Sequence, residues 1–147
     1  MLQTVIFIGR SGAGKGVQSA NLQKFLKEKY PETPTLYIET GAHFREFVKN
    51  EGYTWERARA VNHAGGRQPE FLAVWVWAGL FIGELKGNEH IVFDGTPRSL
   101  GEAQMLSTAL PFYERKILQL YTSMFHVSGR KHDFRGAGAR MISTQRL

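Results

Sequence analysis

The stretch that decides the fold is Gly9-Arg10-Ser11-Gly12-Ala13-Gly14-Lys15-Gly16. It follows an apolar, β-branched run at residues 4–8, which is typical of a buried parallel strand, and helix-forming residues begin at Gly14. In this setting glycines let backbone N–H groups turn around an anion, the helix N-terminus adds partial positive charge, and Lys15 adds a full charge. The sequence therefore predicts a phosphate-binding loop, and the alternative is a glycine turn that is only flexible.

Apolar runs and helical periodicities alternate along the rest of the chain, up to about residue 115. Strands are expected at residues 4–8, 35–39 and 90–93, and helices from residue 14, between residues 40 and 52, and over residues 55–64, 69–86 and 100–113. The pattern at residues 74–77 also permits a strand. The order of elements predicts an α/β fold with a doubly wound parallel sheet, in which ligands bind beyond the carboxyl ends of the strands. Gly9 and Asp94 both lie at such ends.

Composition limits the classes of protein to consider. A chain of 147 residues with 42% hydrophobic residues can bury one core, and the absence of cysteine excludes disulfides and cysteine metal sites. The longest apolar run, residues 71–83, is too short to span a membrane, and the N-terminus lacks the basic lead and the cleavage site of a signal peptide. We expect a cytoplasmic protein with no membrane partner.

Two further blocks carry side chains that suit nucleotide chemistry. In Glu39-Thr40-Gly41-Ala42-His43-Phe44-Arg45, the planar guanidinium of Arg45 suits a phosphate. In Asp94-Gly95-Thr96-Pro97-Arg98, an acid at a strand end can order magnesium-bound water, and Arg98 can bridge donor and acceptor phosphates. The alternatives are a surface helix for the first block and an N-capping aspartate with a turn proline for the second.

Taken in order, the three blocks resemble the adenylate kinases, which are nucleoside monophosphate kinases. That family has a lysine followed by glycine in its phosphate loop, an S-T-G-D-x-[LF]-R segment and a D-G-[FY]-P-R segment. This chain departs from the pattern where the family has threonine, aspartate, an aromatic residue and glutamine: Val17, Ala42, Thr96 and Glu102. The match covers residues 1–115 and implies a P-loop NTPase core, incomplete at the C-terminus, that includes a monophosphate-binding arm at about residues 40–86.

The resemblance implies a role for each matching residue. Lys15, Asp94 and Arg98 would be catalytic. The residues that bind ATP would be Gly9, Ser11, Gly12, Ala13, Gly14, Lys15, Gly16 and Val17. The residues that bind the nucleoside monophosphate would be Thr40, Gly41, Arg45, Gly95, Arg98 and Glu102.

The resemblance also implies a cofactor and a loop that lines the acceptor base. Mg²⁺ would accompany ATP, held mainly through phosphates and water, and the histidines show no metal-ligand spacing, so no metal site of protein ligands is expected. Residues 66–70 would line the acceptor base. The aromatic residues that follow, Phe71, Trp75 and Trp77, are expected to lie in the core rather than to stack on a base.

Residues 116–147 do not continue the family pattern. Residues 1–114 contain twelve basic and twelve acidic residues, so the net charge of +6 comes from the end of the chain. Residues 128–139 are polar and glycine-rich, a composition that favours disorder. We expect an aberrant, poorly ordered tail.

A lost base near Lys116 is our interpretation of this tail. Back-translation, read from the third base of each codon, permits N-P-x-[VI]-[VIL]-Y-I-N-V-S-R-E-W-x-x-[AT]-R-L-x-G-R-G-R-A-D-D, which resembles the missing family segment. The codon of Met124 fixes the valine that follows Y-I-N, and the codon of Met141 fixes one aspartate of the pair. A frameshift also explains the basic excess and so weakens a nucleic-acid-binding hypothesis. The alternative is a divergent natural tail.

The predicted function is ATP-dependent phosphoryl transfer by a monomer to a nucleoside monophosphate, with AMP as the first choice (ATP + AMP = 2 ADP). Such catalysis is mostly positioning and charge neutralisation, so the loss of the lid and of the C-terminal arginines is expected to impair it. The alternative is a non-catalytic, nucleotide-binding remnant of such a kinase.

Overall fold

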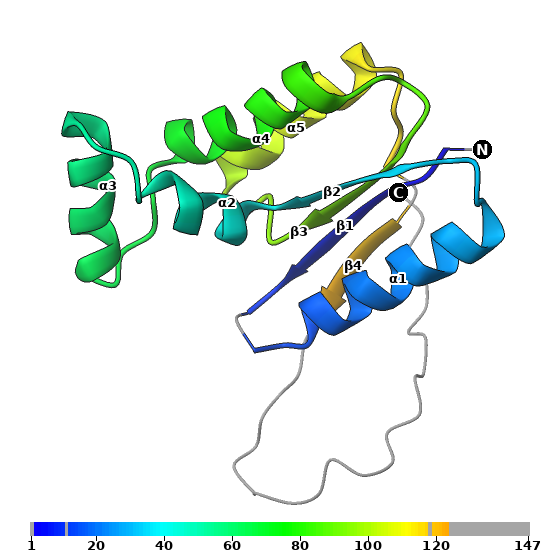
Figure 1. The fold of residues 1–147 in the computed structure, drawn as a ribbon, viewed down its shortest axis with the longest axis horizontal. Helices are drawn as coiled ribbons and strands as arrows, with labels where there is room; N and C mark the ends of the chain where they lie inside the picture. The colour runs from blue at the N-terminus through cyan, green and yellow to red at the C-terminus, as the bar shows by residue number, and fades with distance from the viewer. Residues whose placement is uncertain (1, 11, 118, 124–147) are drawn as a thin grey trace, which may run out of the picture.

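The computed structural model describes residues 2–10, 12–117 and 119–123, which form a four-stranded parallel sheet in the order β2-β3-β1-β4 (Figure 1). The central pair is β1 with β3, where Thr4 lies opposite Ile91 and Phe7 lies opposite Asp94. The strands are β1 (Thr4–Gly9), β2 (Thr35–Glu39), β3 (His90–Asp94) and β4 (Gln119–Ser123). The three strands expected from the sequence are confirmed.

Helices cover both faces of this sheet. Figure 1 shows α1 on one side and α4 with α5 on the other, while α2 and α3 lie beyond the carboxyl end of β2. Their bounds are α1 (Lys15–Lys29), α2 (Thr40–Phe47), α3 (Tyr53–His63), α4 (Glu70–Glu84) and α5 (Leu100–Phe112). Parallel strands need crossover connections, and these helices supply them. The predicted doubly wound α/β fold is therefore confirmed.

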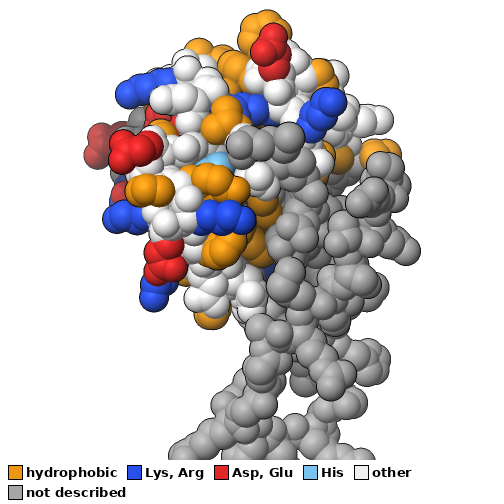
Figure 2. Space-filling model, turned by 90° about the vertical axis from the view of Figure 1, so that its right-hand side faces the viewer, with side chains coloured by type: hydrophobic (Ala, Val, Ile, Leu, Met, Phe, Trp, Pro, Cys, Tyr) orange, Lys and Arg blue, Asp and Glu red, His pale blue; other side chains and the backbone are white. Residues whose placement is uncertain are grey.

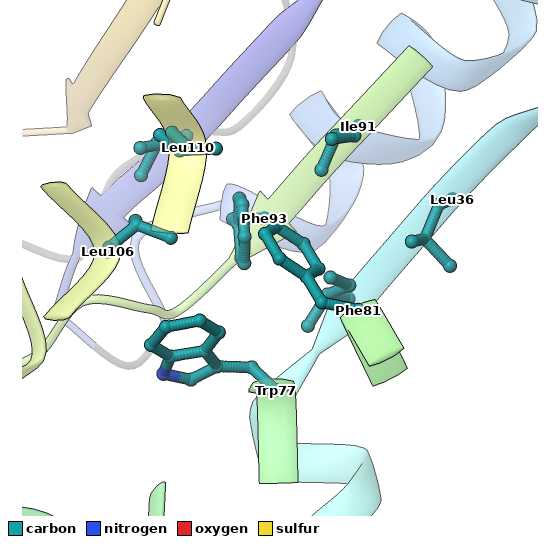
Figure 3. Close-up of a cluster of buried hydrophobic side chains, with 9 residues drawn as sticks. Leu36, Trp77, Phe81, Ile91, Phe93, Leu106 and Leu110 are labelled. Carbon is teal, nitrogen blue, oxygen red and sulfur yellow. The ribbon is translucent and has the colours of Figure 1, made fainter. Parts of the chain in front are cut away.

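The main core lies between the sheet and the pair α4–α5. β3 is buried at all of its positions, as expected for a central parallel strand covered on both faces. Trp77 and Phe81 of α4 meet edge to face, with ring centroids 5.7 Å apart, and Phe81 also packs on Phe93 (Figure 3). The buried members of this cluster are Ile6, Leu36, Ile38, Trp77, Phe81, Ile91, Phe93, Leu106 and Leu110.

Helix α4 resolves one open alternative and corrects one expectation. Its buried residues include Ala73, Trp77 and Phe81, a spacing of four that fits a helix and excludes the strand considered for residues 74–77. Trp77 is buried as predicted, but the core placement of the other two aromatic residues is wrong, since Phe71 is 70% exposed and Trp75 is 60% exposed. Both lie on the side of α4 that faces away from the sheet, because a helix with one buried stripe must leave its opposite side outside.

Strand β4 is an element that the sequence reading did not foresee. We assigned everything after about residue 115 to an aberrant tail, yet residues 119–123 form a strand parallel to β1, with Val5 opposite Gln119 and Gly9 opposite Ser123. The physical reason is that a strand on this side pairs with the backbone donors and acceptors of β1, and residues 120–122 are Leu, Tyr and Thr, which favour strands. Residues 124–147 of the predicted tail lie outside the described part of the chain.

The surface of the described residues gives two further results. No helix among them is long and apolar enough to cross a bilayer. On the face seen in Figure 2, basic and acidic side chains are interspersed rather than segregated. This mixture agrees with the even balance of charge over residues 1–114.

The strand order creates a crevice at one end of the sheet. After β1 the chain continues into α1 on one face, and after β3 it continues into α5 on the other face. At such a switch point the two loops diverge, and ligands of doubly wound proteins bind between them. The loops at residues 9–15 and 94–100 are therefore the place to look for a site.

Candidate active site

The loop between β1 and α1 is shaped to surround an anion. Gly12 and Gly14 have φ angles of 78° and 79°, a left-handed conformation that glycine adopts without strain. Gly14 is the N-cap of α1, and among the described residues no side chain caps this helix and no acid lies in its first turn. The N–H groups at the start of α1 are therefore left for a ligand.

Lys15 begins α1, and its side chain folds back over the loop. Its Nζ atom donates to the carbonyl oxygens of Gly9, at 2.9 Å, and of Arg10, at 2.8 Å. The ammonium group is thereby held at the mouth of the loop. Three more residues are predicted to contact ATP: Ala13 in the loop, and Gly16 and Val17 in the first turn of α1. The Val17 side chain is 64% exposed. Ser11 lies outside the described residues.

Asp94, at the carboxyl end of β3, is buried and is bonded by two hydroxyl groups. Its Oδ2 atom accepts from Tyr37 Oη at 3.0 Å and from Ser19 Oγ at 3.3 Å. Burial raises the pKa of Tyr37, and the neighbouring carboxylate of Asp94 raises it further, so this phenol stays protonated and can donate. The sequence reading missed Ser19 and Tyr37.

The turn after Asp94 directs Arg98. Gly95 has a φ angle of 82°, and its N–H donates to the carbonyl of Phe7 at 3.1 Å, which ties the turn to β1. Arg98 Nε donates back to the carbonyl of Gly95. Thr96 is fully buried, and its hydroxyl is hydrogen-bonded to that of Thr40. This bond joins the second and third sequence blocks, which are 56 residues apart in the chain.

A cleft of about 460 Å³ opens beside this turn, between α2, the loop before α4 and the start of α5. Its lining includes five of the six residues predicted to bind the monophosphate, namely Thr40, Gly41, Arg45, Arg98 and Glu102. Gly95 does not line it. The loop predicted to line the base is also there, as Gly66, Arg67, Gln68, Pro69 and Glu70.

Two guanidinium groups face the same glycine in this cleft. A Cβ atom placed on Gly41 would lie 3.5 Å from Arg45 Nη1 and 3.7 Å from Arg98 Nη2. Arg45 also pairs with Glu39, with 2.9 Å between Nη2 and Oε1. Arg67 Nη1 approaches the carbonyl of Arg98 at 3.5 Å, so a third arginine is close. This concentration of forked, positively charged groups suits a phosphate.

Glu102 has a structural task in addition to lining the cleft. Ser99 is the N-cap of α5, and its Oγ accepts from the N–H of Glu102 at 3.1 Å, while Glu102 Oε2 accepts from the N–H of Arg98 at 3.3 Å. The first bond is the N-cap half of a capping box, which the spacing Ser-x-x-Glu indicates, whereas the second bond goes to the residue before the N-cap. Burial raises the pKa of Glu102, and the nearby Glu70 adds to this, against the hydrogen bond and charge of Arg98 and a bond from Thr96, which lower it.

The described residues do not form a metal site on their own. They contain no group of three or more histidine, aspartate or glutamate residues that could hold an ion. Asp94, a single carboxylate beside the loop, fits the way in which Mg²⁺ is bound together with substrate phosphates, through one or two carboxylates and water.

Comparisons with known proteins agree with this geometry. No protein-family model matches the chain. The chain is 33% identical over 120 residues to an adenylate kinase of Flavobacterium psychrophilum, covering 80% of this chain and 57% of the relative. It is 36% identical over 114 residues to that of Flavobacterium johnsoniae (76% and 54%) and 34% identical over 108 residues to that of Thermus thermophilus (74% and 51%). The chain spans about half the length of the curated relatives that it matches.

Proposed function

Since about three quarters of this chain is related to the adenylate kinases, we propose that it binds ATP at the phosphate loop and a nucleoside monophosphate, AMP by first choice, in the cleft. The reaction would transfer the terminal phosphoryl group of ATP to the monophosphate, giving two molecules of ADP when the acceptor is AMP. Residues 40–86 would form the acceptor arm. We also propose that the protein acts as a monomer in the cytoplasm.

The observation that carries this proposal is the approach of Arg45 and Arg98 to Gly41. A phosphate seated there would meet two forked donors, and the Arg98 side chain also begins at the turn that Asp94 opens. Phosphoryl transfer needs little covalent chemistry from the protein, because its barrier is lowered by alignment of the reactants and by neutralisation of charge. Arg98 would thus serve both substrates.

The phosphate loop would supply the ATP site. The N–H groups of residues 12–16 and the ammonium of Lys15 would replace water around the phosphates. Mg²⁺, when bound with ATP, supplies positive charge to the phosphate oxygens. Asp94 would accept hydrogen bonds from the metal-bound water, while Ser19 and Tyr37 keep hold of its Oδ2 atom.

Lys15→Ala tests the ATP site directly. We expect the variant to show no measurable ATP binding by calorimetry, because it loses the full positive charge of the phosphate cradle. Lys24→Ala is the matched control, since Lys24 lies on the same helix with a side chain that is 79% exposed and paired with Glu28. Equal ATP affinity in the Lys15 variant and the parent chain would refute the assignment of the loop.

A non-catalytic nucleotide-binding remnant is the second candidate function. It is favoured by the sequence after about residue 115, which does not continue the family pattern that carries further arginines. Measurement of ADP formation from ATP and AMP in the presence of Mg²⁺ separates the two candidates. A chain that binds ATP in a Lys15-dependent manner without forming ADP is a remnant, whereas one that forms ADP is a kinase.

A further inference from the structure

Three elements bring one hydroxyl-rich cluster together behind the phosphate loop. Ser19 comes from α1, Tyr37 from β2 and Asp94 from the end of β3. Ser19 is 1% exposed and Asp94 is 7% exposed. Besides their bonds to Asp94 Oδ2, the hydroxyl oxygens of Ser19 and Tyr37 lie 3.3 Å from each other. A single carboxylate oxygen therefore accepts hydrogen bonds from two different elements.

Packing alone does not call for these hydroxyls. Tyr37 packs against an apolar cluster formed by Val5, Phe7, Leu26 and Val92, where a phenylalanine ring would have the same shape. Burying a carboxylate costs free energy unless hydrogen-bond donors surround it, so the two hydroxyls serve to stabilise Asp94 rather than the apolar packing. A carboxylate is expected at such a buried position where it takes part in binding.

Ser19 also connects Asp94 to the first turn of α1, which directly follows the phosphate loop. It lies four residues after Lys15 and therefore on the same side of α1. Its Oγ atom is 3.1 Å from the carbonyl oxygen of Gly16 as well as 3.3 Å from Asp94 Oδ2. By contrast, the side chain of Val17, two residues nearer the loop, has no hydroxyl and is largely exposed.

We propose that Ser19 and Tyr37 are positioning residues that fix the carboxylate of Asp94 for the binding of Mg²⁺ with ATP. This inference rests on the proposed function of the loop. With Oδ2 bound by two hydroxyls, the carboxylate cannot rotate freely, and less conformational entropy is lost when metal-bound water is ordered against it. Hydrogen-bond partners behind a metal-site ligand set its orientation in this way, and their loss lowers metal affinity about 10- to 100-fold.

Calorimetry with and without metal tests the proposal without relying on turnover. ATP affinity is measured in excess Mg²⁺ and again in EDTA, for the parent chain, Tyr37→Phe, Ser19→Ala and the double variant. The ratio of the two affinities is the gain that Mg²⁺ provides. We expect this ratio to be about tenfold smaller in the double variant than in the parent chain, and to fall less in each single variant. The ATP affinity in EDTA should stay at the parent value.

Tyr30→Phe is the matched control. Tyr30 packs against the same apolar cluster, but its ring lies 5.1 Å from His90, at the opposite end of β3 from Asp94. The control should keep the full gain from Mg²⁺. Thermal unfolding of all variants without nucleotide shows whether each one folds, and Ser19→Ala provides a second reading if Tyr37→Phe does not.

The outcomes separate this inference from the proposed function. A normal gain from Mg²⁺ in the double variant, or an equal loss of ATP affinity with and without Mg²⁺, overturns the positioning role but leaves the ATP site intact. If the parent chain binds no ATP, or Lys15→Ala binds it normally, the proposed function fails and the positioning role fails with it.

Discussion

At the scale of single residues, Glu102 has two opposing effects on stability, one from its hydrogen bond and one from its buried charge. Its carboxylate accepts from the N–H of Arg98 just before α5. The residue is 4% exposed, and burial raises its pKa above the ordinary value of 4.5. A carboxyl whose pKa is higher in the folded state costs stability once it ionises. That cost is absent below the unfolded pKa and develops as the pH rises from there through the folded pKa.

We therefore expect Glu102→Gln to raise the free energy of unfolding at pH 7. A glutamine keeps the hydrogen bond to the N–H of Arg98 but carries no charge. The measurement is urea unfolding of parent and variant at pH 7 and pH 4. The advantage of the variant should shrink at pH 4, where the parent carboxyl is largely protonated in both states. A variant that is less stable than the parent at pH 7 would contradict this argument.

Glu102 should also affect the choice of acceptor base. A carboxylate accepts from an exocyclic amine but cannot donate to a ring nitrogen of adenine, whereas a glutamine amide can do both. Glu102→Gln should therefore increase selectivity for AMP over CMP, compared by kcat/KM in a chain whose reading frame is restored near Lys116. Gln104 is the residue to change next if selectivity rises only slightly. An unchanged preference would show that Glu102 serves α5 alone.

The sequence allowed some site residues to be proposed because their chemistry is local. The loop glycines and Lys15 lie in one continuous stretch, so the turn and the charge could be inferred together. Ser19 and Tyr37 could not be found in this way, because their meeting with Asp94 depends on β2 lying beside β3 and α1 packing over both. The Ser99-x-x-Glu102 spacing does indicate the N-cap of α5, because it is a local signal.

At the scale of elements, α4 provides a paired test of burial. Trp77 is 2% exposed and packs in the main core, whereas Trp75 is 60% exposed and touches Phe47 of α2 at 5.5 Å between ring centroids. Trp77→Ala should destabilise the fold by about 3–5 kcal/mol, because it removes a large side chain and leaves a cavity. Trp75→Ala should cost clearly less. Urea unfolding of both variants is the measurement, and equal costs would contradict the described orientation of α4.

Among the elements, the helices and the first three strands were predictable and β4 was not. The strands β1, β2 and β3 are short apolar runs that end at turn residues, and α4 has apolar residues on nearly every side. The apolar pattern favoured a buried helix for α4 while also permitting a strand at residues 74–77, and it could not show which tryptophan would face outward. Residues 119–123 gave a weak signal, because their pairing with β1 joins segments more than 100 residues apart.

At the scale of the whole molecule, the interpretation of residues 116–147 makes a strong prediction. Restoring one base near Lys116 should convert a poor kinase, or an inactive chain, into an active one. The restored frame would add arginines from the R-E-W and G-R-G-R-A-D-D segments, and one positioned arginine in phosphoryl transfer contributes on the order of 10³ to 10⁵ in rate. ADP formation from ATP and AMP with Mg²⁺ is measured for both forms. Comparable turnover would show that the written tail is a working, divergent lid, and the DNA sequence around Lys116 is the independent check.

The position of β1 in the sheet has a consequence for the newly made chain. β1 is the first strand to leave the ribosome, yet both of its neighbours come late, with β3 beginning at His90 and β4 at Gln119. During most of synthesis this apolar strand has no partner, while β2 emerges and must also wait for β3. Such late, long-range pairing slows folding and leaves strand edges open to other chains. The growing polypeptide should therefore depend on chaperone protection until β3 has been made, and a release of that dependence once residue 94 has emerged would mark the moment at which β1 and β2 gain their shared neighbour.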